Sequence, residues 1–299
     1  MIVARTFMNR SWIDVSSPTQ EDVDALLLSY NIDPSIARDL LSPTPKQQVR
    51  EYDDSFYTVI HLPYFDKNGN PEIQEIDCVI TENSLLTVRY DSIDALHYFG
   101  KQMEADQILG KSSATHPLFG LMKEVYKSMS NELSSVDGWL SDIEEHIFNG
   151  QEKEMVLGIS SVSRHLLNFR RIVSPHQSVW QNLHTLGQEK FGNEFAKETN
   201  IIIEEVRRLL SSVESLGQMI DELRETNNSL LSTKQNEIMK VFTILAFITF
   251  PLSLIAGIFG MNTSFIPLVG LPQDFWLVIA LMLVAVLAMF GFFRYKKWI

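Results

Sequence analysis

Cysteine is almost absent from this sequence of 299 residues, which contains only Cys78. A single cysteine excludes a disulfide within the chain and fits a reducing compartment. Cys78 lies in the strand-like stretch 75–80, which predicts an inward-facing thiol rather than a reactive one. The motifs of enzyme chemistry are missing too: there is no glycine-rich phosphate loop, no Gly-x-Ser-x-Gly and no Cys-x-x-Cys. We therefore expect no enzyme activity and no cofactor.

Basic residues are fewer than acidic ones, and the formal net charge is −12 at pH 7. The imbalance comes from residues 1–239, which hold 36 acidic and 21 basic residues. A surface of this sign argues against nucleic acid as a partner and is compatible with divalent cations. Histidine is scattered without metal-ligand spacing, so we expect surface or core positions for all seven. They are His61, His97, His116, His146, His165, His176 and His184.

Charge is missing altogether from two stretches near the C-terminus, residues 241–261 and 275–293. As a helix, the first stretch spans roughly 30 Å, enough to cross the hydrocarbon core of a bilayer. Two such stretches in succession, followed by a basic tail at 294–299, predict two transmembrane helices that form a hairpin. The lipid bilayer is thus an expected partner.

Basic residues flank the hairpin on both sides. Lys234 and Lys240 precede it, while Arg294, Lys296 and Lys297 follow it. Positive charge marks the cytoplasmic side of a membrane protein, so we expect both termini in the cytoplasm and an extracytoplasmic loop at 262–274. No basic segment followed by an apolar one opens the chain, so the two late spans are expected to direct it to the inner or plasma membrane.

Residues 1–105 predict a cytoplasmic α/β domain of the α+β class. Strand-like residues fill 11–15, 49–52, 56–62, 73–81 and 85–90, with a turn signal at 66–70. Helices are expected from Ser17 through Tyr30, from Asp33 to Ser42, and over 91–102. Helices followed by consecutive strands indicate a largely antiparallel sheet.

Residues 106–192 predict a cytoplasmic helical hairpin. Apolar residues at helical spacing fill 118–148, and Asn149-Gly150 is typical of a helix end. A second helix is expected over 152–185, with a kink or break at Pro175. The next break is expected at 187–192, where glycine occurs twice.

A third helical pattern begins near Asn193 and continues into the first span, so residues 193–240 predict a stalk helix. Its apolar residues recur at steps of three, four or seven, which is typical of coiled-coil packing. A lone stalk helix has no partner for this stripe, so the pattern predicts an oligomer. The stripe consists of Phe195, Ile202, Val206, Leu209, Val213, Leu216, Ile220, Leu223, Leu230 and Ile238. Pro251, inside the span, is expected to bend the helix or to free a carbonyl group.

One face of the first span carries the small residues Ser253, Gly257 and Gly260, spaced by four and three. Such a face suits either a close contact between helices or the wall of a pore. The outer end favours the pore, because the carbonyl of Gly260 and the side-chain oxygen of Asn262 suit a hard cation that keeps its water. Towards the N-terminus the same face continues through Phe250, Ala246, Phe242, Met239 and Asn236.

Four ordered stretches resemble the CorA magnesium channels. They are 236–240, 250–252, 255–262 with its closing Gly-Met-Asn, and 293–299 with its Lys-Lys-Trp tail. The resemblance implies a funnel-shaped homopentamer that mediates Mg²⁺ influx. The first span would line a central pore, and the second would pack outside it. Upstream, the helical region is compatible with the family in length and pattern.

The resemblance also implies roles for single residues. Gly260, Met261 and Asn262 would form the selectivity ring, where Asn262 binds the ion through its water shell. Ser253 and Gly257 would line the pore further in, and Met239 and Phe242 would form its narrow apolar neck. Lys296 and Lys297 would ring the cytoplasmic side of that neck. Asn236, Ala246 and Phe250 complete the predicted pore wall.

Two alternatives remain open. The first is a Zn²⁺ or Co²⁺/Ni²⁺ transporter of the same fold, either passive or coupled to protons. Phe259 stands where the family usually has tyrosine, and the ZntB branch of the family shares much of the motif. A membrane-anchored coiled-coil sensor or scaffold without transport is the second. The family also uses acidic residues between cytoplasmic domains as a regulatory Mg²⁺ site, which the sequence does not locate. Three helical acid pairs are more simply solvated faces: Glu144 and Glu145, Glu204 and Glu205, Asp221 and Glu222.

Overall fold

Six strands of the N-terminal part form one mixed sheet in the computed structural model, which describes residues 2–7, 10–30, 32–65, 71–109, 116–262, 270 and 273–298. The predicted turn at 66–70 and most of the predicted loop at 262–274 lie outside these residues. The chain divides into two compact units, Met1–Arg224 and Glu225–Ile299.

The sheet has the strand order β1-β2-β6-β5-β4-β3. Only β2 and β6 run parallel among the described strands, with Ile13 opposite Leu86, so the predicted, largely antiparallel sheet is confirmed. The strands are β1 (Ile2–Phe7), β2 (Arg10–Ser16), β3 (Gln48–Glu51), β4 (Phe56–Phe65), β5 (Pro71–Ile80) and β6 (Ser84–Arg89).

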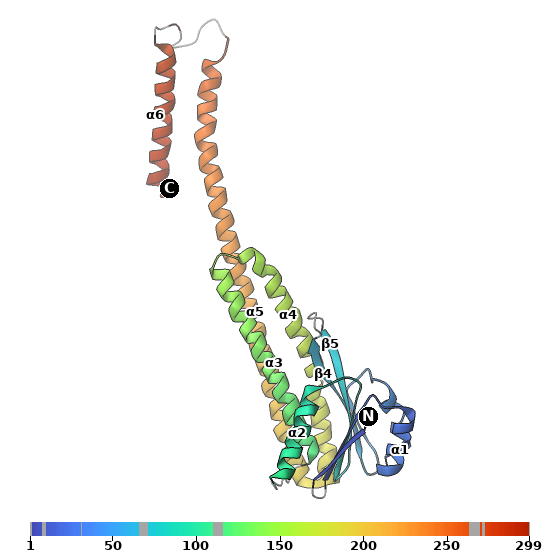
Figure 1. The fold of residues 1–299 in the computed structure, drawn as a ribbon. Coiled ribbons are helices and arrows are strands. Elements are labelled where there is room, and N and C mark those ends of the chain that lie inside the picture. Colours follow the sequence, from blue (N-terminus) through green and yellow to red (C-terminus); the bar gives the residue numbers. More distant parts are fainter. Residues whose placement is uncertain are drawn as a thin grey trace. The chain divides into compact units, whose positions relative to one another are not determined.

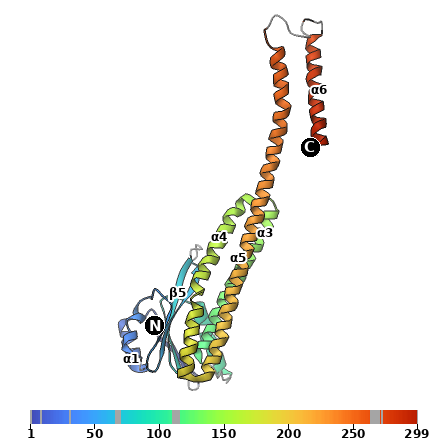
Figure 2. The same cartoon turned by 180° about the vertical axis from the view of Figure 1, so that it is seen from behind.

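Side chains alternate along each strand, so both faces of the sheet carry side chains, and helices cover both faces. One face meets helix α1 (Gln20–Tyr30) in a core that includes Val15, Val23, Leu26 and Val88. The other face meets the later helices. There the ring centroid of Trp12 in β2 lies 4.9 Å from that of Phe99 in helix α2 (Asp94–Ile108). Figure 1 shows the sheet between α1 and the long helices, and Figure 2 shows the same layers from behind.

Two local predictions are corrected. Strand β1 was not expected, because its sequence Ile-Val-Ala-Arg-Thr-Phe lacks clear alternation, and pairing with β2 decides its conformation. The helix expected from Asp33 is reduced to two 3₁₀ turns, η1 (Pro34–Ile36) and η2 (Asp39–Leu41). Asp33 caps the first turn by accepting from the amide of Ser35. Only Ile36 and Leu40 are fully buried there, so little apolar contact supports a longer helix.

Two long helices joined by a short connection follow the sheet. Helix α2 (Asp94–Ile108) precedes α3 (Pro117–Phe148), which is joined to α4 (Glu152–Val173) by a tight connection. Gly150 adopts φ 90° there, a conformation that glycine enters without steric cost. The break at Pro175 separates α4 from α5 (His176–Phe259). Within α5, Gly192 has φ 85° and ψ −174°, so two helices meet there, as the glycine signal at 187–192 predicts.

The apolar stripe after Gly192 does not require an oligomer over most of its length, contrary to the prediction from its spacing. From Phe195 to Leu223 its side chains are buried inside the single chain. They pack beside α3 and α4: Phe195 lies 4.9 Å from Phe119, and Arg224 reaches Ser163 at 3.5 Å. The chain therefore supplies the partner that a lone stalk helix lacks. Only the later positions stay open, since Leu230 is half-buried and Ile238 is 57% exposed.

The second unit contains the end of α5 and helix α6 (Asp274–Tyr295). Both are long and apolar enough to cross a membrane, and their apolar windows are not buried in the chain. They contain the two predicted spans, apart from Gly260 and Met261 beyond the last turn of α5. Apolar side chains exposed to this extent need lipid or protein around them.

Candidate ion pathway

The face of α5 on which the predicted pore residues lie is open in the single chain. At 3.6 residues per turn these positions fall on one side of the helix. All are exposed except Ala246, which is half-buried: Asn236, Met239, Phe242, Phe250, Ser253 and Gly257. Except for Thr243, the other half-buried side chains of this stretch lie on the opposite side: Ile244, Ile248, Pro251, Leu252, Ile255 and Phe259. The helix thus has two distinct faces.

Small residues leave the open face free of contacts along its outer half. A Cβ added at Gly257 meets no heavy atom within 4 Å, and Ser253 is exposed on the preceding turn. Such a surface lets another helix approach closely or leaves room for water. Within the described residues, the face therefore admits both interpretations that the sequence left open.

The Gly-Met-Asn segment ends the helix. The amide of Gly260 donates to the carbonyl of Ala256 at 2.9 Å, and that of Met261 to Ile258 at 3.3 Å. A Cβ at Gly260 would lie 2.9 Å from the Ala256 carbonyl oxygen, closer than such atoms approach, so a side chain there would make this turn shift. Asn262 follows with an exposed side chain. The segment therefore presents an uncharged amide directly beyond an apolar helix.

Pro251 lies inside α5 without breaking it. Because proline has no amide hydrogen, it donates nothing to the carbonyl of Phe247 one turn earlier. Thr249 lies beside this gap, but its hydroxyl donates to Leu245 at 3.0 Å. The carbonyl that loses its helical donor is therefore that of Phe247.

The basic tail is held by a turn at the end of α6. Trp298 stacks on Phe293 with ring centroids 5.8 Å apart and an interplanar angle of 16°, and its amide donates to the Phe293 carbonyl at 2.9 Å. Phe293 also contacts Phe247 of α5 edge-on at 6.4 Å. Lys296 and Lys297 are exposed on this turn. The stacking of Trp298 on Phe293 thus fixes the turn on which the two lysine side chains are exposed.

Three exposed acidic residues of α5 in the first unit pair with arginine. Glu204 lies 2.5 Å from Arg207, and Asp221 lies 2.9 Å from Arg224, each one helical turn away. Glu205 and Arg208 form a similar pair at 2.6 Å. Among the described residues, no three His, Cys, Asp or Glu side chains come together in a way that would hold a metal. A single chain therefore offers no complete regulatory metal site in this part of the structure.

Sequence reasoning missed a buried acid pair on β5. Asp77 is fully buried and accepts from the Tyr90 hydroxyl at 3.0 Å. Burial, reinforced by the nearby Glu75 carboxylate, raises the pKa of Asp77 far above its usual range. Glu75 accepts from the amide of Thr44 at 2.7 Å and lies 3.1 Å from His61. The alternation of acidic and apolar residues in 75–80 was the available signal.

Two histidines are fixed in the core as neutral rings. His116 accepts from the amide of Leu118 at 3.2 Å, and its other ring nitrogen lies 2.9 Å from the Thr81 carbonyl. Burial lowers the pKa of both His116 and His176 to about 4. Cys78 is also buried, as expected, and burial raises its pKa.

Comparison with known proteins places this geometry in a family. The profile described as CorA-like Mg²⁺ transporter protein matches residues 9–296. The chain belongs to the CorA family. Among its relatives, the cobalt/magnesium transport protein CorA of Thermotoga maritima is 25% identical over 292 residues, which cover 97% of this chain and 83% of that protein.

Solved structures agree on the fold. The complete CorA magnesium transporter from Methanocaldococcus jannaschii superimposes with a TM-score of 0.85 at 24% identity, covering 99% of this chain and 94% of that one. The ZntB cytoplasmic domain from Vibrio parahaemolyticus gives 0.63 at 12% identity, covering 76% and 90%. The CorA fold predicted from the ordered motifs is thus confirmed for the whole chain.

Proposed function

We propose that this CorA-family chain is a divalent cation channel that carries Mg²⁺ into the cell. The observation that carries the proposal is the placement of Asn262. An uncharged side-chain oxygen stands at the end of an apolar helix whose open face has no charged side chain from Val241 to Met261. A ring of such oxygens would bind a cation through its water shell, because Mg²⁺ gives up its water reluctantly.

The pore would be built from several copies of the chain. The open face of α5 from Met239 to Gly257 would line it, and the exposed Ile238 supports an interface that begins near the membrane. We propose a homopentamer in accordance with the family resemblance. We also propose that each chain divides into the domain, hairpin, stalk, spans, loop and tail given by the sequence prediction. Met239 and Phe242 would form an apolar neck that closes by losing water.

The driving force would be the membrane potential. A doubly charged ion gains about 4.6 kcal/mol per 100 mV on entering a cell that is negative inside. Lys296 and Lys297 would lie at the cytoplasmic end, where they anchor the topology and oppose cations electrostatically. Gating by cytoplasmic Mg²⁺ would require acidic residues from neighbouring copies, since one chain assembles no metal site among its described residues.

Proteoliposomes loaded with a magnesium-sensitive dye test the proposal. Potential-driven Mg²⁺ entry is expected for the natural chain. Loss of selective entry is expected for Asn262→Ala, with assembly unchanged. Asn228→Ala is the matched control, because Asn228 is an exposed asparagine on the same helix, about two turns before the first predicted pore residue Asn236. Normal Mg²⁺ entry through Asn262→Ala would refute the role of the ring.

A transporter for Zn²⁺, Co²⁺ or Ni²⁺ is the second candidate, favoured by the similarity of the first unit to the ZntB cytoplasmic domain. Zinc entry driven by a pH gradient, with no Mg²⁺ entry, would identify it. Absence of any flux would favour a membrane-anchored scaffold instead.

A further inference from the structure

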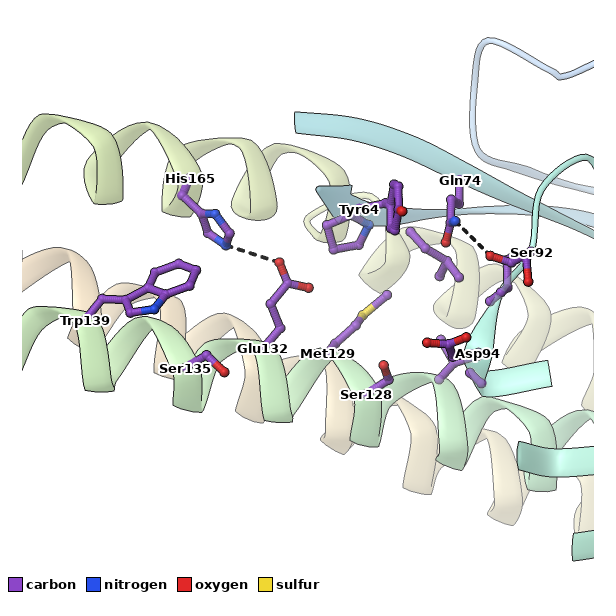
Figure 3. Close-up of a pocket in the computed structure, with 15 residues that line it drawn as sticks. Tyr64, Gln74, Ser92, Asp94, Ser128, Met129, Glu132, Ser135, Trp139 and His165 are labelled. Atoms are coloured by element: carbon purple, nitrogen blue, oxygen red, sulfur yellow. Dashed lines mark hydrogen bonds and ion pairs between the residues drawn. The ribbon is translucent and has the colours of Figure 1, made fainter. Parts of the chain in front are cut away.

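A cavity of about 590 Å³ lies in the first unit, between the helix-covered face of the sheet and helices α2, α3 and α4. Figure 3 shows its labelled side chains converging from these elements. Its size falls in the range of small-molecule sites. None of the predicted pore residues lines it, so the cavity is separate from the proposed pathway.

The charged groups of the cavity are mainly acidic. Glu132 of α3 and Asp94 of α2 contribute carboxylates, and no lysine or arginine is among the described residues that line it. Asp94 stands in the first turn of α2. His165 Nε2 lies 3.1 Å from Glu132 Oε1, so the imidazole is oriented by one carboxylate oxygen. The cavity therefore attracts cations.

A third acceptor comes from the sheet. Gln74 is only 9% exposed, and its amide nitrogen donates to the carbonyl of Ser92 at 3.0 Å. A carbonyl only accepts, so this bond fixes which end of the amide faces Ser92. The amide oxygen is turned the other way, towards the cavity, as Figure 3 shows. A buried acceptor aimed at the space favours a ligand that donates hydrogen bonds.

Aromatic and apolar side chains form the rest of the wall. Trp139 is 44% exposed and meets His165 edge-on at 5.2 Å, and Tyr64 is exposed to a similar extent. Aromatic faces attract organic cations, and Met129, Ile93 and Val125 offer apolar surface to methylene groups. This combination does not suit a bare metal ion, for which no set of three ligands is present among the described residues.

We propose that this cavity binds a linear aliphatic polyamine. One ammonium group would lie between Glu132 and Trp139, and another would approach Asp94 and the amide oxygen of Gln74. The methylene chain between them would rest on Met129. Ammonium groups only donate hydrogen bonds, and the carboxylates of Glu132 and Asp94 and the amide oxygen of Gln74 accept them. The inference does not rest on the proposed transport, because binding is measured without flux.

Isothermal titration of the full-length protein in detergent with spermidine, in buffer that contains Mg²⁺, tests the site. One molecule is expected to bind per chain, and Glu132→Gln is expected to weaken binding at least tenfold. Asp94→Asn and Trp139→Leu are expected to weaken it severalfold. Glu144→Gln is the matched control, because it removes an equal charge from an exposed position on the same helix α3. This control is expected to leave binding unchanged.

Two outcomes would overturn the proposal. Equal weakening by Glu144→Gln and Glu132→Gln would mean that spermidine follows the general acidity of the surface. Displacement of spermidine by Mg²⁺ in a Glu132-dependent manner, one ion for one amine, would mean that the cavity holds a hydrated metal ion. Gln74→Met keeps the proposal testable if the charge variants fold poorly, since it removes only the buried acceptor and should also weaken binding.

Discussion

The hydroxyl of Tyr126 lies 2.9 Å from Nδ1 of His176 in the core of the first unit. On its other side the imidazole offers Nε2 to the carbonyl of His61 at 2.8 Å, so Nε2 carries the hydrogen and Nδ1 accepts from Tyr126. Trp180 completes the chain by donating to the Tyr126 oxygen at 2.6 Å. This network ties α3 and α5 to strand β4 and requires a neutral His176.

Stability should fall in mild acid because of His176. Burial lowers its pKa from 6.5 to about 4, so the unfolded chain takes up a proton first as the pH drops. The stabilising contribution is full above pH 6.5 and is lost between pH 6.5 and 4, by about 3 kcal/mol for this residue. Denaturant unfolding of the full-length protein at several pH values measures the slope.

Replacing His176 with a residue that does not titrate isolates its pH-dependent contribution to stability. His176→Gln keeps a donor and an acceptor but does not titrate, so its stability should depend less on pH between 6.5 and 4 than that of the natural chain. Tyr126→Phe leaves the Trp180 donor and His176 without their partner and should cost about 1–3 kcal/mol at neutral pH. An unchanged pH slope in His176→Gln would contradict the assignment.

Asp77 should have the opposite pH dependence. Its pKa is raised by burial and by Glu75, so the folded state holds a proton that the unfolded state releases above pH 3.8. Its contribution is present in acid and is lost as the pH rises towards the folded pKa. Asp77→Asn mimics the protonated form and should make the protein more stable at pH 8 than the natural chain. Thermal unfolding at pH 5 and pH 8 checks this, and a variant less stable at pH 8 would show that Asp77 is ionised in the fold.

The two parts of the apolar stripe on α5 should respond differently to charge. Val213 is 2% exposed, so Val213→Asp buries a carboxylate and should unfold the first unit or destabilise it by several kcal/mol. Ile238→Asp places the same group on an exposed position and should leave the fold of the chain intact while weakening the proposed oligomer. Thermal unfolding and light scattering on the purified protein separate these effects. An Ile238→Asp protein of unchanged size would argue against an interface at that position.

Gly260 should tolerate no side chain. The added Cβ of Gly260→Ala would meet the Ala256 carbonyl at 2.9 Å, so the turn that presents Asn262 must shift. We expect Mg²⁺ entry into proteoliposomes to fall at least tenfold. Gly291→Ala on α6 is the matched control, because an added Cβ there meets nothing within 4 Å. Equal flux through both variants would mean that the geometry of Gly260 is unimportant for conduction.

Much of this fold follows from local sequence. The uncharged runs at 241–261 and 275–293 predict two spans by length alone. The segments of β4, β5 and β6 are rich enough in β-branched and aromatic residues to be recognised as strands. Pro175 and Gly192 mark helix breaks through their own backbone chemistry. Gly260, Met261 and Asn262, with the motifs around them, also indicated the family. These features depend on near neighbours in the chain, which a sequence displays directly.

Other features depend on segments that are distant in sequence. The stripe from Phe195 to Leu223 looked like an oligomer interface, but α3 and α4 cover it, and periodicity does not name the partner of an apolar face. The protonation of Asp77 and the neutrality of His176 depend on burial and on the groups that the fold brings to them. The cavity at Glu132, Gln74 and Asp94 joins three separate elements. The sequence by itself thus determined most helices and strands, the two spans and the family. Only the tertiary structure decided which faces are covered, which polar groups meet, and that residues 2–7 form a strand.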